Sequence, residues 1–234
     1  MAAILLIETA TQVCSAGLCV DNHLVSIRES FDQRSHAELI TTYISEVINE
    51  GGLSFEQLDA VAVSKGPGSY TGLRIGVSTA KGICFACDIP LISIDTLQAL
   101  AFGMKLQADK LFIENDQLFC PMIDARRMEV YTAIFDSTLS TVMPTTALVI
   151  EADSLNHWLV NKKVCFAGDG SAKCNQILSH ENACFIDGVH PSVVNMVNHA
   201  NQAFSEGKFE NLAYFEPFYL KDFVAGLPKV KGLH

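Results

Sequence analysis

The sequence has little positive charge. Lys and Arg number 16 against 26 Asp and Glu over 234 residues, which gives a formal net charge of −10 at pH 7. A molecule with this charge repels a nucleic-acid backbone, and the short basic tail at 229–231 is too small to reverse the effect. We therefore expect any contact with RNA to depend on the basic surface of a partner.

Long hydrophobic runs are also missing. The N-terminal apolar run at 4–7 ends at Glu8 and follows no basic residue, so it is too short for a signal peptide or a membrane span. We expect a cytoplasmic protein that does not contact a membrane. Because 49% of the residues are apolar, the chain can bury a core in one large domain or in two small ones.

The eight cysteines and seven histidines form no pattern typical of a disulfide framework or a metal site. The cysteines lie in apolar stretches such as 164–166, which is typical of buried thiols in a reducing compartment. The C-x-x-C pair Cys84 and Cys87 falls late in a predicted helix, where the helix dipole raises a thiol pKa, so packing is the simpler explanation. The histidines include no HxxxH or HExxH pair. We expect no metal and no cofactor of the chain's own.

Hydrophobic patterning predicts an α/β protein. In the first half the expected strands cover 4–8, 14–20, 23–29, 60–64 and 91–94, and the expected helices cover 36–50 and 71–87. The pair Asp21-Asn22 between the second and third strands tolerates positive φ. Ser35 and Glu38 form a capping box at the start of the first helix, which Gly51-Gly52 ends.

A similar order of elements recurs less clearly in the second half. We expect strands near 118–123, 130–135 and 147–150, then a helix, a strand at 164–167 and another helix. Such a duplication makes two lobes with a cleft between them. The boundary is predicted between 103 and 117. Residues 1–105 then form an N-terminal lobe, and 106–234 form a smaller lobe whose last segment packs back on the first.

The most informative local feature is the glycine-rich run Gly66-Pro67-Gly68-Ser69-Tyr70-Thr71-Gly72. A strand, a glycine turn and a helix in this order can present backbone N–H groups to a phosphate. A Walker loop, however, needs Gly-Lys-Ser/Thr where Gly72-Leu73-Arg74 stands, and an esterase G-x-S-x-G needs glycines at 67 and 71. The dinucleotide fingerprint is one residue too long and Pro67 removes a donor, although Asp95 lies where a ribose-binding acid belongs.

The predicted helix at 71–87 is apolar over an unusually wide arc. At 100° per residue, Gly72, Gly76, Ala80, Ile83 and Cys87 share one face, with Leu73 and Val77 beside it. This arc is about twice the ~100° stripe needed to dock on one sheet. Glycines four residues apart let another helix approach closely, at a cost of roughly 1 kcal/mol each. The covering element is either part of the same chain or a second protein.

Three short segments could contact a nucleotide in the cleft between the lobes. Glu8, Thr9 and Thr11 could face a metal–phosphate group, or end the first strand in a capped turn. Asp124 and Arg126, with Arg127, could clamp an anion; we interpret them as a surface ion pair on a solvated face, with the clamp as the alternative. Gly168 and Gly170 frame a turn that fits a nucleotide or an ordinary strand-to-helix loop.

Several motifs occur in a characteristic order along the whole chain. They are Ile7-Glu8-Thr9-Ala10-Thr11, Ser35-His36-Ala37-Glu38, the run at 66–76, Asp124-Ala125-Arg126-Arg127 with Glu129-Val130-Tyr131, and Pro217-Phe218-Tyr219-Leu220. Together they resemble the bacterial TsaB (YeaZ) family. The glycine run is highly specific, and the other motifs agree with it in order and spacing.

The resemblance implies an actin/Hsp70-like (ASKHA) fold of two ribonuclease-H-like lobes. It also implies a non-catalytic scaffold role in forming N6-threonylcarbamoyladenosine at tRNA position 37. The implied partners are a TsaD-like catalytic subunit and a TsaE-like ATPase, which use the ATP and metal, while tRNA is contacted only through the complex. Members of the family form homodimers through first-lobe helices. The expected interface consists of Leu39, Tyr43, Val47, Gly72, Leu73, Gly76, Val77, Ala80 and Ile83.

The residues support an enzymatic function less well than a scaffold role. TsaD-like relatives carry a His-x-x-x-His metal pair where this sequence has Thr96 and Leu100, and we identify no activated nucleophile, so we expect neither transferase catalysis nor proteolysis. Glu8 stands where the resemblance predicts aspartate, which argues against nucleotide binding. Two rivals remain: an actin-like phosphotransferase or ATPase that uses Glu8, Thr11 and the turn at Gly168, and a Rossmann-type reductase that uses Asp95.

Overall fold

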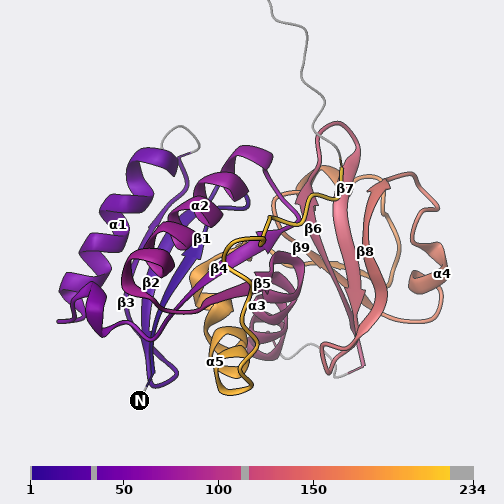
Figure 1. The fold of residues 1–234 in the computed structure, drawn as a ribbon. Helices are drawn as coiled ribbons and strands as arrows, with labels where there is room; N and C mark the ends of the chain where they lie inside the picture. The colour runs from indigo at the N-terminus through magenta and orange to yellow at the C-terminus, as the bar shows by residue number, and fades with distance from the viewer. Residues whose placement is uncertain (1, 33–35, 112–115, 222–234) are drawn as a thin grey trace, which may run out of the picture.

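The computed structural model describes residues 2–32, 36–111 and 116–221, which form two five-stranded sheets with flanking helices (Figure 1). The first sheet has the order β3-β2-β1-β4-β5. Its strands are β1 (Ala3–Glu8), β2 (Cys14–Val20), β3 (His23–Ser30), β4 (Ala60–Gly66) and β5 (Leu91–Asp95). β1 is antiparallel to β2 and parallel to β4. The five strands predicted for the first half are confirmed, as is the β2–β3 turn, where Asp21 and Asn22 have φ of 49° and 66°.

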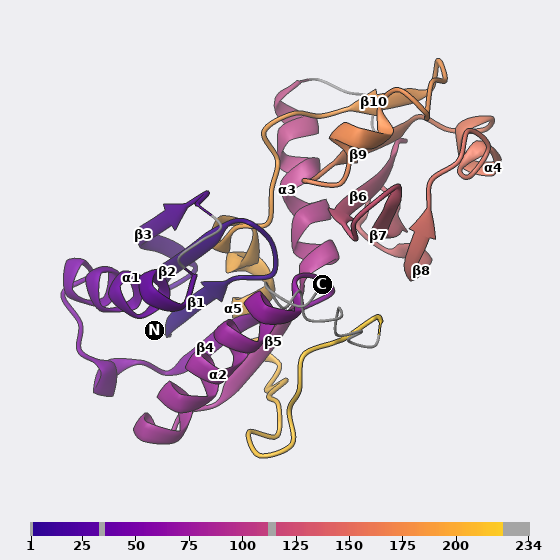
Figure 2. The same cartoon turned by 90° about the horizontal axis from the view of Figure 1, so that it is seen from above.

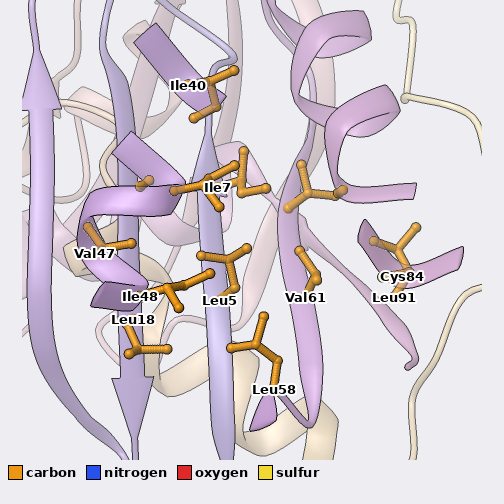
Figure 3. Close-up of a cluster of buried hydrophobic side chains, with 14 of the residues drawn as sticks. Leu5, Ile7, Leu18, Ile40, Val47, Ile48, Leu58, Val61, Cys84 and Leu91 are labelled. Atoms are coloured by element: carbon orange, nitrogen blue, oxygen red, sulfur yellow. The ribbon is translucent and has the colours of Figure 1, made fainter. Parts of the chain in front are cut away.

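Helices α1 (His36–Glu50) and α2 (Tyr70–Cys87) cover one face of this sheet. Ile40, Val47 and Ile48 of α1 meet Leu5 and Ile7 of β1 in a shared core (Figure 3). The predicted helical spacing is thus confirmed, because the buried residues of α1 recur every three to four positions. The predicted capping residue Ser35 lies outside the described residues.

Helix α3 (Thr96–Lys110) lies between the two sheets and is absent from our sequence prediction (Figure 2). Ala99 packs in the core under the first sheet, whereas Leu100 and Met104 pack in the core of the second. A helix buried on two sides has apolar residues all round, so it lacks the one-sided stripe by which we recognised α1. The predicted boundary between the two lobes, after residue 105, falls inside this helix, and the division into lobes stays a prediction.

The second sheet has the order β10-β9-β6-β7-β8. Its strands are β6 (Leu118–Asp124), β7 (Glu129–Phe135), β8 (Thr141–Val149), β9 (Val164–Ala167) and β10 (Ala183–Phe185). The prediction was wrong in detail here, because β8 begins at Thr141 and β10 was not expected. The helix expected after 150 is only the short α4 (Asn156–Leu159), and the one expected after 167 is a single 3-10 turn at Ala172–Cys174.

The chain then returns to the first sheet. A 3-10 turn (Val193–Met196) and helix α5 (Val197–Ser205) pack on the face opposite α1 and α2. The C-terminal segment, residues 208–221, next runs along α2, where the Lys81 ammonium donates to the Phe215 carbonyl (3.0 Å). It crosses towards β7, where Lys221 pairs with Glu129 (Figure 1). In the described part of the chain no helix is long and apolar enough to cross a membrane.

Candidate functional site

A cleft of about 970 Å³ lies where the two halves of the molecule meet. One side includes residues 10–12, after β1, His36 and Ala37 at the start of α1, and residues 68–72 at the start of α2. The other side consists of residues 124–127 in the β6–β7 turn and Asp169, and the C-terminal segment adds 219–221. Clefts of this size are typical of small-molecule sites.

The glycines of the predicted phosphate turn fit α2 against the chain's own β1 turn. A Cβ at Gly68 would lie 2.3 Å from the Ala10 carbonyl oxygen, and one at Gly72 would lie 2.1 Å from that of Thr9. Two hydrogen bonds span the same contact: Ser69 N donates to the Ala10 carbonyl (2.6 Å), and the Thr9 hydroxyl donates to the Gly72 carbonyl (2.8 Å). The close approach that the glycines permit is therefore made within the chain.

The small-residue face of α2, which we predicted to be a docking surface for a partner, is instead packed inside the chain. Gly72, Leu73, Gly76, Val77, Ala80 and Val47 are all buried in the chain's own core. Leu39, Tyr43 and Ile83 are only partly buried and border that core. The exposed side of α2 instead carries Arg74, Ser78, Gly82 and Phe85, and Phe85 is 82% exposed. Periodicity alone could not tell which face the sheet covers, because the helix is apolar over so wide an arc.

Glu8 lies beneath the cleft rather than in it. Its side chain is fully buried, and Oε1 accepts hydrogen bonds from Ala10 N (2.6 Å) and the Ser64 hydroxyl (2.8 Å). Within the described residues Oε2 has no hydrogen-bond partner. Burial raises the pKa of Glu8 to about 7, although the two hydrogen bonds oppose the shift. Of the three residues predicted near a nucleotide on this side, Glu8 and Thr9 hold the β1 turn, and only Thr11 lines the cleft.

The β6–β7 turn supplies the other side. Arg126 and Arg127 line the cleft, and both have positive φ, 71° and 51°. The predicted ion pair with Asp124 is wrong, because the Asp124 carboxylate pairs with the Lys173 ammonium and accepts a hydrogen bond from the backbone N–H of Arg126 (3.0 Å). Lys173 was missed because nothing in its local sequence indicates that the fold brings it to this turn.

Gly168 and Gly170 hold the next turn close to β6. Gly168 has φ of 104°, and a Cβ there would lie 2.3 Å from the Met122 carbonyl oxygen. A Cβ at Gly170 would lie 2.9 Å from the Ile123 carbonyl carbon. These glycines are therefore explained by packing. The cleft residue of this turn is Asp169 between them, whose Oδ1 accepts from Asp124 N (3.1 Å) and whose pKa burial raises.

The cleft is lined by cations, hydroxyl groups and carboxylates. Across the described residues, no group of three His, Cys, Asp or Glu side chains could hold a metal ion. The eight cysteines are free thiols. Burial raises the pKa of Cys84, in the C-x-x-C pair, to about 12, so this thiol is a poor nucleophile.

Comparison with known proteins identifies relatives along the chain. The family model of TsaD, described as tRNA N6-adenosine threonylcarbamoyltransferase, matches residues 30–229. The tRNA threonylcarbamoyladenosine biosynthesis protein TsaB of Escherichia coli (strain K12) is 28% identical over 230 residues, which cover 95% of this chain and 96% of that protein. TsaB of Haemophilus influenzae is 35% identical over 128 residues, 55% of this chain and 51% of that one. The solved structure of YeaZ from Pseudomonas aeruginosa has a TM-score of 0.79 at 22% identity, covering 94% of this chain and 100% of that one.

The likeness to YeaZ confirms the predicted fold class. Both sheets are mixed and carry flanking helices, and the TsaD-like domain belongs to the actin-like (ASKHA) fold. The family model covers most of the chain, and relatives that match along it are named TsaB. The chain therefore belongs to the TsaD family and, within it, to the TsaB (YeaZ) proteins.

Proposed function

We propose that this chain is a non-catalytic, cytoplasmic subunit required for forming N6-threonylcarbamoyladenosine at tRNA position 37. It binds a TsaD-like catalytic subunit, and a TsaE-like ATPase completes the complex. ATP and metal belong to the partners, and tRNA meets this chain only within the complex. In the absence of partners the chain forms a homodimer through the surface that otherwise binds the TsaD-like subunit. The names of its relatives support the pathway, and the solvent-facing side of α2 supports the docking role.

The proposed docking surface is the exposed side of α2 with the neighbouring part of the C-terminal segment. Phe85 lies one turn after Lys81, whose ammonium binds the carbonyls of Ala213 and Phe215 on either side of Tyr214. Phe85 is 82% and Tyr214 84% exposed. Large aromatic side chains presented to solvent on ordered elements are typical anchors of protein interfaces. This observation carries the scaffold proposal.

Phe85→Glu tests the surface. Burying a carboxylate without a partner opposes association, and truncating an aromatic anchor weakens binding by about 2 kcal/mol or more. We expect Phe85→Glu to weaken both self-association, measured by sedimentation equilibrium, and binding to a purified TsaD-like subunit by at least about tenfold.

Val160→Glu is the matched control, because Val160 is 68% exposed but lies just after α4, at the second sheet. It should leave both affinities unchanged. Wild-type affinity of a folded Phe85→Glu variant would contradict the docking surface. The function itself is tested by a tRNA modification assay with TsaD-like and TsaE-like subunits: modification that proceeds unchanged without this chain would contradict it.

A further inference from the structure

We propose that Cys165 and Cys184 form an oxidisable thiol pair, which a hydroperoxide converts into a disulfide and a thiol reductant opens again. The two residues lie in the second sheet, on β9 and on the edge strand β10. In the reducing compartment that we expect for this chain, such a bond is transient. This inference goes beyond the docking role, which uses the exposed side of α2 and involves neither strand.

The two cysteines lie directly opposite each other on neighbouring strands. β9 and β10 are parallel, and their register places Cys184 beside Cys165. Neighbouring strands lie about 4.8 Å apart, which is within the Cα separation of about 4.4–6.8 Å that a disulfide spans. Both cysteines pack in the core against α3, whereas Phe166 and Phe185, which follow them, pack in the core on the other face of the sheet. The two sulfur atoms therefore lie on the same face.

A hydrogen bond joins the two sulfur atoms. Burial raises the pKa of the Cys165 thiol, and so do the charge of the Cys184 thiolate and the hydrogen bond between the pair, although the Lys163 ammonium opposes the shift. A hydrogen bond raises the pKa of the group that donates it, so Cys165 keeps its proton and donates to Cys184. Cys184 is therefore the sulfur that carries the negative charge when the pair ionises.

The pair combines an accessible sulfur with a buried one. Cys165 is fully buried, whereas Cys184 belongs to a three-residue edge strand whose side chains are all half-buried. A water-borne oxidant therefore reaches Cys184 first. Redox-sensitive cysteines are typically accessible and lie beside a second cysteine that can resolve them. Because β10 pairs with β9 on one side only, it can shift to bring the two sulfur atoms into bonding distance without breaking a second ladder.

Oxidation of the pair by a hydroperoxide balances in two steps. The Cys184 thiolate attacks a hydroperoxide oxygen, the O–O bond breaks, an alcohol leaves with the proton that the thiol released, and Cys184 becomes a sulfenic acid. The Cys165 sulfur then attacks the Cys184 sulfur, the S–O bond breaks, and hydroxide leaves with the Cys165 proton as water. The pair loses two electrons and two protons, and the hydroperoxide is reduced to an alcohol and water.

The disulfide would close a ring that includes part of the cleft wall. The chain between the two cysteines, 166–183, contains the turn at Gly168 and Gly170 that brings Asp169 to the cleft. A cross-link between the ends of a segment restricts the conformations that the segment can adopt. Oxidation therefore links the chemistry of the two thiols to a segment that shapes one side of the cleft.

Peroxide treatment of the full-length chain tests the proposal. The reduced protein is treated with hydrogen peroxide, denatured, alkylated, and analysed by intact-mass spectrometry and peptide mapping. We expect two of the eight thiols to escape alkylation and the map to contain a peptide pair that joins Cys165 to Cys184. Dithiothreitol should restore both thiols.

Three variants separate the roles of the two sulfur atoms. Cys184→Ser, on the edge strand, should keep all of its remaining thiols after peroxide. Cys165→Ala should stop at a sulfenic acid on Cys184, which dimedone captures. Cys87→Ser is the matched control, because Cys87 is also half-buried but ends α2, and this variant should lose two thiols as wild type does.

Four results would overturn the proposal. They are alkylation of all eight thiols after millimolar peroxide, a disulfide that involves other cysteines or joins two chains, a sulfinic acid on wild-type Cys184 in place of the disulfide, and loss of two thiols in Cys184→Ser. The wild-type peptide map and Cys184→Ser decide the matter even where Cys165→Ala does not fold. None of these outcomes bears on the Phe85 docking test when that test is run in dithiothreitol.

Discussion

Gly76→Leu is expected to prevent stable folding of the chain. Gly76 lies where α2 crosses the β1 turn, and a Cβ there would be 2.2 Å from the Thr9 hydroxyl oxygen and 3.5 Å from Val63. Thr9 cannot yield, because its hydroxyl is bonded to the Gly72 carbonyl one turn away. Inserting a side chain into such a contact destabilises a core by about 1–3 kcal/mol or more. Here the whole helix would have to move, so we expect a loss above that range, measured by urea denaturation.

Gly82→Ala is the matched control on the same helix. A Cβ at Gly82 has no atom within 4 Å, so alanine only improves helix propensity and should stabilise the chain by roughly 0.5–1 kcal/mol. A Gly76→Leu protein with the denaturation midpoint of wild type would refute this account of the glycine face. If the account holds, lost association in a Gly76 variant reports unfolding and says nothing about an interface.

Glu8→Gln is expected to change how stability depends on pH. The fully buried Glu8 has its pKa raised from 4.5 to about 7 by desolvation. A raised pKa means that the folded chain holds a proton which the unfolded chain releases. This contribution is complete below pH 4.5, is lost as the pH rises to about 7, and stays lost above it. The loss is on the order of 3 kcal/mol, at about 1.4 kcal/mol per pH unit.

The variant keeps an acceptor for Ala10 N and Ser64 but carries no charge. We therefore expect Glu8→Gln to be close to wild type in unfolding free energy at pH 5 and clearly more stable at pH 8. Glu216→Gln, which removes an exposed carboxylate, should follow the wild-type curve. The measurement is chemical denaturation at several pH values; a constant difference between Glu8→Gln and wild type from pH 5 to 8 would show that Glu8 is not the titrating group.

The first half of the fold is predictable because its signals are local. The apolar spacing in α1 and the positive-φ pair Asp21-Asn22 depend only on neighbouring residues. Helix α3 escaped prediction because two sheets bury it, which removes the contrast between an apolar and a polar side. In the second half, strand and helix lengths depend on tertiary contacts, so β8 and α4 differ from expectation.

The candidate site was only partly predictable. Arg126 and Thr11 were identified by their places at the ends of strands, where both line the cleft. The ion pairs of the acids in the cleft were not predicted, because the lysines that form them are distant in sequence. Lys173 is 49 residues from Asp124, and Lys221 is 92 residues from Glu129. The glycine run predicts a close contact, because glycine has no side chain, but it does not indicate which residues are contacted. The folded chain shows that these residues are Thr9 and Ala10.

Helix α3 bears on how the molecule melts. Its residues belong to the core beneath the first sheet and to the core of the second, so neither sheet keeps its hydrophobic interior when the other unfolds. Both halves should therefore lose structure together in a single calorimetric peak. It follows that a partner bound only to α2 would also slow hydrogen exchange in β6 and β9, strands it never touches.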